Sequence, residues 1–439
     1  MARTGPARTG PATARCCGPR QIALLVLGLT ILSFVLLLSW VLGSPPQGRS
    51  HPSSLGVDKR SVNVQLAPPP PPDSLLSRKQ TGEKQSLTWW GGTIERPAPV
   101  PLEKSSYPSY LDLHDVVTSW NPDNPDPPSL FRETLAHFNY SNLAERAMAE
   151  QYRNAELPFK VYDVPDFDAV SRKWDDSFLS REFRKMGSVH VERSDNNHFM
   201  YWTMKGGREP EGYTPPTEII DDMDFDEWVK LAHKADATKV DNATEHFYLM
   251  ASSSPGDRGR VFIARDLKLF STPEENFFIT RPHANKGIQC RLSMRGVISE
   301  AHYDSGRNMV AMLRGVKRYI LNPPSACPRL KLIADVNHPS YRHSVIDWSD
   351  PAQAKRAFQG VQALDTLLRV GEVLYIPTGW SHYIISLMYS MQCNSRSGSP
   401  PNGEGLGEIE KCMGRPLPRS LGGGGRGGRA KSGRSFRAA

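Results

Sequence analysis

The feature that most constrains this chain is a pair of histidine-containing segments that must meet in space. His302-Tyr303-Asp304 lies in one predicted strand, and His382 follows another about eighty residues later. Residues two apart on a strand point to the same face, so His302 and Asp304 can reach one atom. A fold that brings His382 to that atom gives two imidazoles and one carboxylate around it. The sequence therefore predicts a metal site with three protein ligands.

Short strand-like segments separated by turn residues dominate residues 288–397. The predicted strands cover 309–313, 317–321, 373–376 and 382–387. Glycines and prolines such as Gly315, Pro323 and Gly371 separate them. Many short strands with loops favour an antiparallel barrel or a double-sheet jelly roll over a parallel α/β sheet. Residues 351–367 read as a helical insertion between two of these strands.

The region before these strands has a mixed pattern. Helical spacing predicts a helical lead-in over 126–156 and further helices over 174–186 and 219–237. Short apolar or alternating segments predict three strands, at 157–162, 188–193 and 246–250.

Residues 22–42 form an uninterrupted run without charge, IALLVLGLTILSFVLLLSWVL. About 20 apolar residues span the hydrocarbon core of a bilayer as a helix, so this run is predicted to be a membrane anchor. Four basic residues precede it: Arg3, Arg8, Arg15 and Arg20. The positive-inside rule then places residues 1–21 in the cytosol and the main body across the membrane. A cleaved signal peptide is the alternative, although its apolar region is normally about 7–15 residues long.

Two other segments have compositions that do not build a core. Residues 43–125 are rich in proline, serine and glycine, and the proline run at 68–72 must adopt polyproline II. We expect a stem that holds the main body away from the bilayer, with a ligand for a proline-recognising domain as the alternative. Residues 398–439 are rich in glycine and arginine and are predicted to be a disordered tail.

The sequons agree with an extracytoplasmic main body, in which four of the cysteines would face an oxidising lumen. Asn139-Tyr140-Ser141 and Asn242-Ala243-Thr244 can accept N-linked glycan if they are luminal and exposed. Four cysteines follow the predicted anchor and stem: Cys290, Cys327, Cys393 and Cys412. In an oxidising lumen they permit at most two disulfides in one of three pairings, and free buried thiols are the alternative.

The formal net charge of +8 does not by itself indicate nucleic-acid binding. Much of the charge lies at the two ends of the chain, in the arginines before the apolar run and in five basic residues of the tail: Arg426, Arg429, Lys431, Arg434 and Arg437. Basic ends are usually topology signals or solvated tails, so no nucleic-acid partner is expected.

Two segments together resemble a known family. HYDSGRNMVAMLRGVKRYILNPP, from His302 to Pro324, and GEVLYIPTGWSHYI, from Gly371 to Ile384, look like the JmjC/cupin-8 family. The likeness is particularly to small JmjC hydroxylases similar to the factor-inhibiting-HIF asparaginyl hydroxylase, and it covers about residues 157–397. It implies a mainly β fold, a double-stranded β-helix of the cupin jelly-roll type with flanking helices. It also implies an enzyme that uses Fe(II), 2-oxoglutarate and O2.

The resemblance assigns roles residue by residue. It gives three iron ligands, which are also the catalytic residues: His302, Asp304 and His382. This 2-His-1-carboxylate set is typical of non-haem Fe(II) oxygenases. It gives four residues that contact the co-substrate: Lys317, Ser299, Asn308 and Asn394. Lys317 occupies the position of the lysine that pairs with the distal carboxylate of 2-oxoglutarate, and a lysine's point charge suits that group.

Two departures from the family leave the substrate open. Arg307 is expected to place a cation near the mouth of the site, and Ser395-Arg396-Ser397 lacks aromatic residues that many relatives have there. We expect a single-pass type II membrane protein of the endoplasmic reticulum or Golgi that hydroxylates a side chain of a secretory-pathway protein. The alternative is a membrane-anchored, metal-containing cupin that binds a glycan or peptide without catalysis. The complete ligand set and Lys317 argue against that alternative.

Overall fold

The structure of this 439-residue chain is a computed structural model that describes residues 78–416, apart from 82–83, 90–91, 188, 205–210, 239–241, 258 and 401–405. None of the helices within these ranges has the length and apolar content needed to cross a bilayer. The predicted anchor at 22–42, the first part of the predicted stem and the end of the predicted tail lie outside the described residues.

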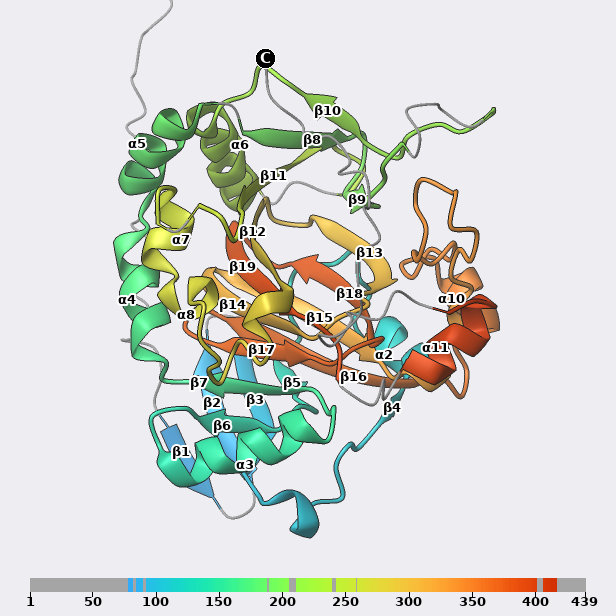
Figure 1. Ribbon diagram of the computed structural model, residues 1–439. Helices are drawn as coiled ribbons and strands as arrows, with labels where there is room; N and C mark the ends of the chain where they lie inside the picture. Colours follow the sequence, from blue (N-terminus) through green and yellow to red (C-terminus); the bar gives the residue numbers. More distant parts are fainter. Residues whose placement is uncertain are drawn as a thin grey trace, which may run out of the picture. The chain divides into compact units, whose positions relative to one another are not determined.

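Two β-sheets form the centre of the described region (Figure 1). The larger has the strand order β10 (Glu218–Ile220), β8 (His190–Ser194), β11 (His246–Ser253), β12 (Asn285–Ser293), β19 (Ser390–Ser397), β14 (Asn308–Arg314), β17 (Val373–Ile376), β7 (Phe159–Tyr162) and β6 (His137–Asn139). The smaller has the order β4 (Leu111–Asp112), β16 (Gln362–Arg369), β15 (Val316–Asn322), β18 (Ser381–Ser386), β13 (Ile298–Tyr303) and β9 (His198–Phe199). Most neighbours are antiparallel, and the pairs β6–β7 and β9–β13 are parallel.

The two sheets share one apolar core. It takes side chains from β14 and β17 of the larger sheet and from β15, β16 and β18 of the smaller one, including Val310, Leu374, Tyr319, Leu364 and Ile384. Two sheets of mainly antiparallel strands that pack face to face are the jelly-roll arrangement expected from the sequence. The mainly β, jelly-roll-like fold with flanking helices is therefore confirmed.

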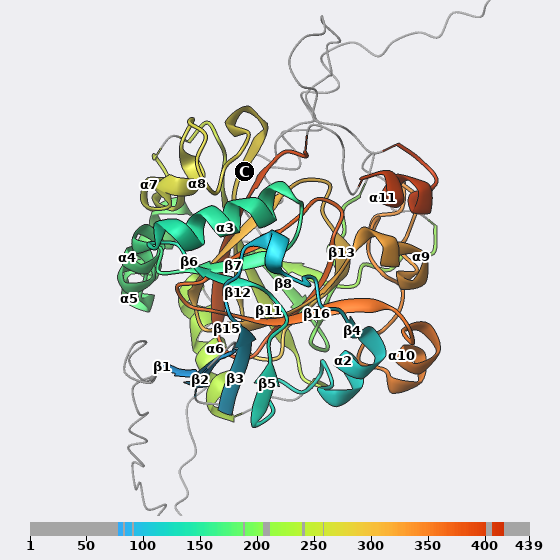
Figure 2. The same cartoon turned by 90° about the horizontal axis from the view of Figure 1, so that it is seen from below.

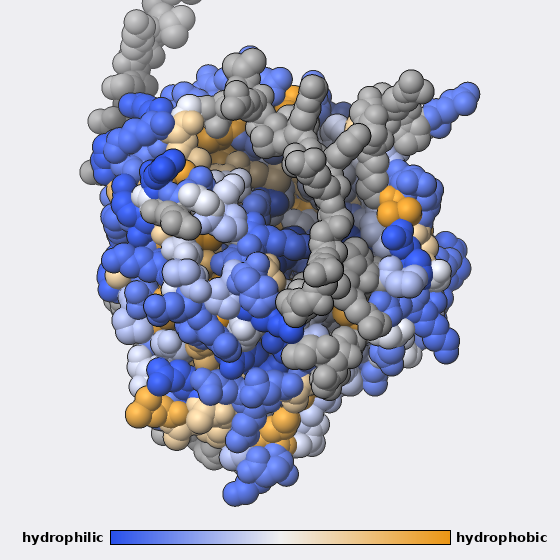
Figure 3. Space-filling model, in the orientation of Figure 1, coloured by the Kyte–Doolittle hydropathy of each residue, from blue (hydrophilic) through white to orange (hydrophobic). Residues whose placement is uncertain are grey.

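Helices cover the outer faces of both sheets. The larger sheet packs against a set that includes α3 (Leu143–Asn154), α4 (Pro165–Lys173), α5 (Asp176–Met186), α6 (Phe225–Thr238), α7 (Phe262–Asp266) and α8 (Lys268–Ser271). The smaller sheet packs against α2 (Leu113–Ser119) and α10 (Pro351–Ala357). Because both faces are covered, every residue of β15, β17 and β18 is buried. The surface drawn in Figure 3 is mostly hydrophilic, with hydrophobic residues in small groups.

The remaining elements are short. A separate sheet has the order β1 (Arg78–Thr81), β2 (Lys84–Trp89), β3 (Gly92–Pro97) and β5 (Leu130–Arg132). The described residues also contain the 3₁₀ turns η1 (Leu102–Lys104), η3 (Pro282–Ala284) and η4 (Pro324–Ala326). Helix α11 (Leu406–Met413), at the C-terminal end of the described region, lies beside α9 (Cys327–Leu330) (Figure 2).

Four cysteines form two disulfides. Cys290–Cys393 joins β12 to β19 in the larger sheet, and Cys327–Cys412 joins α9 to α11. The sequence left open whether these cysteines form bridges and how they pair. The structure has two bridges, with the pairing given above. The second bridge ties α11 to the domain, so residues 406–413, which were predicted to belong to a disordered tail, form a helix with buried Leu406 and Ile409.

The predicted stem is also too long at its C-terminal end. Strand β3 lies within residues 43–125, and its Ile94 and Arg96 are buried. Helix α2, which lies in the same range, buries Leu113, Val116 and Val117 against the smaller sheet. The apolar positions of these elements are few, irregularly spaced and surrounded by prolines. Their periodicity therefore did not predict a strand or a helix.

Three helix predictions were wrong in part. Residues 126–142 form β5 and β6, and the helix begins only at Leu143, where the Asn142 side chain accepts hydrogen bonds from the N–H groups of Ala144 and Glu145. The insertion predicted at 351–367 is helical only to Ala357, and from Gln362 it is strand β16. The helix predicted from 219 begins at Phe225, after β10. In the first two cases pairing with a neighbouring strand overrides the helix-forming composition.

A buried cluster of charges joins segments that are distant in the sequence. The ammonium group of Lys160 lies 2.6 Å from Glu133 and 3.1 Å from Glu372, and all three side chains are at most 3% exposed. Arg369 also pairs with Glu372. Burial alone would raise the pKa of Glu372, but the positive charges of Arg369 and Lys160 outweigh it and lower this pKa to about 2. Buried ions of one sign are costly when their partners are removed.

We therefore expect Lys160→Met to lower the free energy of unfolding by about 3–5 kcal/mol, because Glu133 stays buried without its ion-pair partner and Glu372 loses one of its partners. Chemical denaturation of the chain measures this change. Folding lowers the pKa of Glu372. The ionised carboxylate therefore stabilises the fold at pH values above its unfolded pKa, and this stabilisation is lost as the pH falls toward about 2. Lys355→Met, at an exposed position, is the matched control and should leave the midpoint of the denaturation curve unchanged. Equal denaturation midpoints for the two variants would contradict the prediction.

Candidate metal centre

The pairing of β13 with β18 brings the two predicted histidine ligands together. His302 and His382 are directly opposite one another in this antiparallel pair, and their ring centroids are 4.3 Å apart. Asp304 follows β13 immediately, and its Oδ2 lies 3.9 Å from Nε2 of His382. One donor atom from each of the three residues lies within 4.8 Å of the others. These distances allow the three side chains to bind one cation from one side.

The two imidazoles are held in one orientation by backbone carbonyls. Nδ1 of His302 donates to the carbonyl oxygen of Glu300 at 2.7 Å, and Nδ1 of His382 donates to that of Trp380 at 3.2 Å. Since a carbonyl only accepts, both protons lie on Nδ1 and leave Nε2 free as a ligand. Burial lowers the pKa of both histidines, so both rings are neutral, which is the form that binds a metal.

Asp304 is kept ionised in spite of its burial. Burial would raise its pKa, but Arg396 and the neighbouring histidines outweigh that effect and hold the pKa well below its ordinary value. Nε of Arg396 lies 3.0 Å from Oδ2 of Asp304. The Asn308 side chain donates to the same oxygen at 3.1 Å and accepts from Asn394 at 2.9 Å. The amide N–H of Gly379, in the turn before β18, donates to the Asp304 backbone carbonyl at 2.9 Å.

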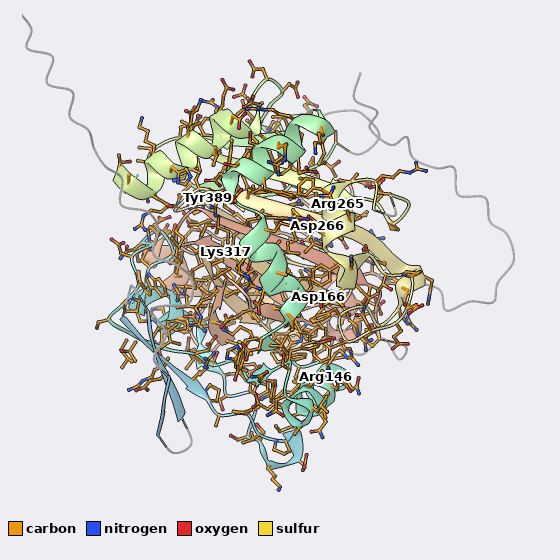
Figure 4. All side chains as sticks on the ribbon, turned by 90° about the vertical axis from the view of Figure 1, so that its left-hand side faces the viewer. Arg146, Asp166, Arg265, Asp266, Lys317 and Tyr389 are labelled. Carbon is orange, nitrogen blue, oxygen red and sulfur yellow. A yellow bond between two sulfur atoms is a disulfide. The ribbon has the colours of Figure 1, made fainter. Side chains whose placement is uncertain are left out.

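A cavity of about 390 Å³ opens at the three donor atoms. Three of the four residues that the sequence assigns to the co-substrate line it: Ser299, Asn308 and Asn394. The fourth, Lys317, lies on β15 among the strands (Figure 4), with 1% of its surface exposed. Its Nζ is 5.5 Å from the ring centroid of Tyr248, another lining residue. The structure therefore places all four candidates in or beside one cavity.

Lys317 is an unusual buried cation. Burial, followed by repulsion from Arg291, lowers its pKa well below the ordinary value. No carboxylate in the described part of the chain forms an ion pair with it. A buried ammonium without an anionic partner is costly, so the site is suited to an acidic group supplied from outside the chain.

The expected position of Arg307 was wrong. Its Nε donates to Glu156 at 2.7 Å, away from the cavity lining. Other cations lie at the cavity instead: Lys286, Arg291, Arg342 and Arg396. Arg396 could have been found from the sequence, since it is two residues beyond Asn394 on one strand and so shares its face.

Arg342 and His343 come from a loop that has no periodic signal. His343 stacks on His302, with ring centroids 4.9 Å apart. No spacing argument would have placed these two residues beside β13.

The donor set fits a divalent metal ion of the non-haem iron type. Two neutral imidazoles and one ionised carboxylate approach from one side, and the cavity lies at the same three residues. Residues 145–396, more than half of the chain, match the cupin-like domain family. The chain belongs to this family. The motifs had indicated it, and the match confirms it.

Curated relatives agree with this membership. The chain is 26% identical over 212 residues to a tRNA wybutosine-synthesizing protein 5 of Danio rerio, covering 44% of this chain and 63% of the relative. It is 29% identical over 112 residues to the lysine-specific demethylase JMJ31 of Arabidopsis thaliana, covering 23% and 20%. It is 30% identical over 96 residues to a JmjC domain-containing protein A of Dictyostelium discoideum, covering 21% and 37%.

The matches thus span less than two thirds of each of these relatives. Together with the family match they indicate an oxygenase-like enzyme. They do not extend to a substrate.

We expect Asn308→Ala to weaken Fe(II) affinity about 10–100-fold, because residues that orient a metal ligand typically contribute that much. Anaerobic calorimetric titration with Fe(II) measures the effect. Asn337→Ala, at an exposed loop position, is the matched control and should bind like the unaltered chain. Unchanged affinity in Asn308→Ala would show that Asp304 does not depend on this hydrogen bond.

Proposed function

We propose that this chain is an Fe(II)/2-oxoglutarate-dependent dioxygenase that hydroxylates a side chain of a secretory-pathway protein. One observation carries the proposal: the donors of His302, Asp304 and His382 meet at a cavity beside which Lys317 is buried without a carboxylate partner. A dicarboxylate co-substrate would supply the anion that Lys317 lacks within the chain.

Each residue then has a defined part in the mechanism. His302, Asp304 and His382 would hold Fe(II), which together with 2-oxoglutarate and O2 supplies the oxidation of a C–H bond, with succinate and carbon dioxide as by-products. Lys317 would pair with the distal carboxylate, and the hydroxyl of Ser299, which donates to Tyr248 Oη at 3.4 Å, lies at the same cavity. Asn308 keeps Asp304 in place. The buried strand walls restrict water near the reacting atoms.

A cavity used only for binding glycan or peptide has less need of these features. Lys317 is fully buried, whereas contact with a neutral glycan requires no desolvated ammonium group. The neutral, carbonyl-anchored histidines likewise suit a metal that remains open to reactants.

The compartment is proposed from several independent features. The uncharged run at 22–42 with arginines before it favours a type II anchor of the endoplasmic reticulum or Golgi. The two disulfides support an oxidising environment for the domain, because such bridges persist mainly outside the cytosol. Substrates met there are proteins of the secretory pathway.

We expect the purified chain with Fe(II) to convert 2-oxoglutarate to succinate, even slowly without a protein substrate. Lys317→Met should raise the Kd for 2-oxoglutarate about 30-fold or more, because it removes the charge that pairs with a desolvated carboxylate. Calorimetry on the Mn(II)-loaded chain measures this Kd.

Lys355→Met, on the exposed surface of α10, is the control and should not change the Kd. Absence of both turnover and 2-oxoglutarate binding in the unaltered chain would refute the enzyme assignment. Metal binding alone would then favour the non-catalytic cupin.

The two sequons should differ in glycan occupancy. Asn242 is exposed in the turn before β11. The Asn139 amide donates to Asp163 at 2.6 Å and accepts from the N–H of Ser141 at 2.9 Å, so it is already engaged. In secretory cells Asn242→Gln should abolish the glycosidase-sensitive gel shift and Asn139→Gln should not. No shift in the unaltered chain would contradict the luminal topology.

A further inference from the structure

We propose that the substrate is a polypeptide segment with aspartate or glutamate side chains beside the reacting residue. This inference rests on the proposed function and adds the chemistry of its substrate. It comes from the charges around the cavity, which are unbalanced after the metal and co-substrate are taken into account.

Positive side chains outnumber negative ones at the cavity. Four cations line it: Lys286, Arg291, Arg342 and Arg396. The acidic lining residues are Glu192 and Asp304. Four cations and two anions leave an excess of two positive charges in the lining, without counting Lys317, which lies beside it.

Loading the site does not remove this excess. Fe(II) brings two positive charges and 2-oxoglutarate two negative ones, which cancel. Lys317 is assigned to the co-substrate, and Asp304 to the metal. The cations that remain surround the space in which a substrate side chain must lie, and low-dielectric walls strengthen their field.

Both acidic lining residues are already engaged. Glu192 accepts a hydrogen bond from Thr217 at 2.9 Å, and its other oxygen lies 3.1 Å from Nε2 of His190. Asp304 is surrounded by Asn308 and Arg396. A basic substrate side chain would find no carboxylate at the cavity that is not already in use, and it would add to the positive excess.

Two of the cations are exposed enough to meet a substrate. Lys286 is exposed at the start of β12 and forms no ion pair with the carboxylates of the described region. The Arg342 side chain is 26% exposed; its Nη1 donates to the carbonyl of Tyr303 at 3.2 Å and lies 3.8 Å from Oδ1 of Asp304. Arg342 has a φ of 77°, a conformation that non-glycine residues rarely adopt. Such strain is found mainly at functional positions and here directs a cation to the metal centre.

The aromatic residues of the cavity favour polypeptide over nucleic acid. Of Phe199, Tyr201, Tyr248 and Tyr319, which line it, Tyr201 alone is exposed, at 52%. Single-stranded nucleic acid is bound by stacking successive bases on several exposed rings. One exposed ring with cations around it is better suited to a short acidic segment of a protein.

Fluorescence anisotropy on the full chain with Mn(II) and 2-oxoglutarate, without O2, tests the inference. The probes are three pools of short labelled peptides with a degenerate central residue and flanks of Asp/Glu, Asn/Gln or Lys/Arg, and a labelled single-stranded RNA. We expect the acidic pool to bind about tenfold more tightly than the neutral pool, with a preference that falls as salt is added. The basic pool should bind least tightly.

Charge reversal identifies the residues responsible. Lys286→Glu should weaken binding of the acidic pool about tenfold and leave the neutral pool unchanged. Lys355→Glu makes the same charge change away from the cavity and should have no effect. Arg342→Gln should also reduce the acidic preference, with Mn(II) affinity measured in parallel to separate loss of recognition from loss of metal.

The outcomes separate this inference from the proposed function. If Mn(II) and 2-oxoglutarate bind but the three pools do not differ, or the basic pool or the RNA binds most tightly, the substrate assignment is wrong and the proposed function stands. If the unaltered chain binds neither Mn(II) nor 2-oxoglutarate, the proposed function fails and this inference fails with it.

Discussion

The antiparallel pairing of β13 with β18 is the interaction on which the candidate site depends. It sets His302 opposite His382, and the register places Asp304 just past the end of β13, where the turn at Gly379 holds its backbone. A shift of one residue would move each histidine to the other face of its strand. The register is in turn protected by burial, because apolar side chains between the sheets and helices outside them cover both faces of β18.

Burial also decides the charge states that make this site suited to a metal. It keeps the histidines neutral, while their Nδ1 protons are committed to backbone carbonyls. It would neutralise Asp304 as well, were it not for Arg396 beside that carboxylate. The same burial lowers the pKa of Lys317, which has no carboxylate partner from the described chain. The proposed binding of a metal, a co-substrate and an acidic substrate thus depends in each case on buried charges, some of which the fold neutralises with a partner and some of which it does not.

Much of this could be predicted from the sequence because the relevant signals are local. The HxD spacing puts His302 and Asp304 on one face, and the strands that carry His382 and Lys317 have short, clear boundaries. Long-range pairing was harder to anticipate. Residues 362–367 have the composition of a helix but form a strand because β15 lies beside them. Arg342 reaches the metal centre from an irregular loop, and Arg307, which is closer in sequence to the ligands, pairs with Glu156.

The most direct test of the central claim is an anaerobic calorimetric titration of the unaltered chain, first with Fe(II) and then with 2-oxoglutarate. If three side chains share one cation beside an anion site, one equivalent of Fe(II) binds per chain, and 2-oxoglutarate binds tightly only after the metal. Absence of stoichiometric Fe(II) binding, or equal affinity for 2-oxoglutarate with and without metal, would contradict the account.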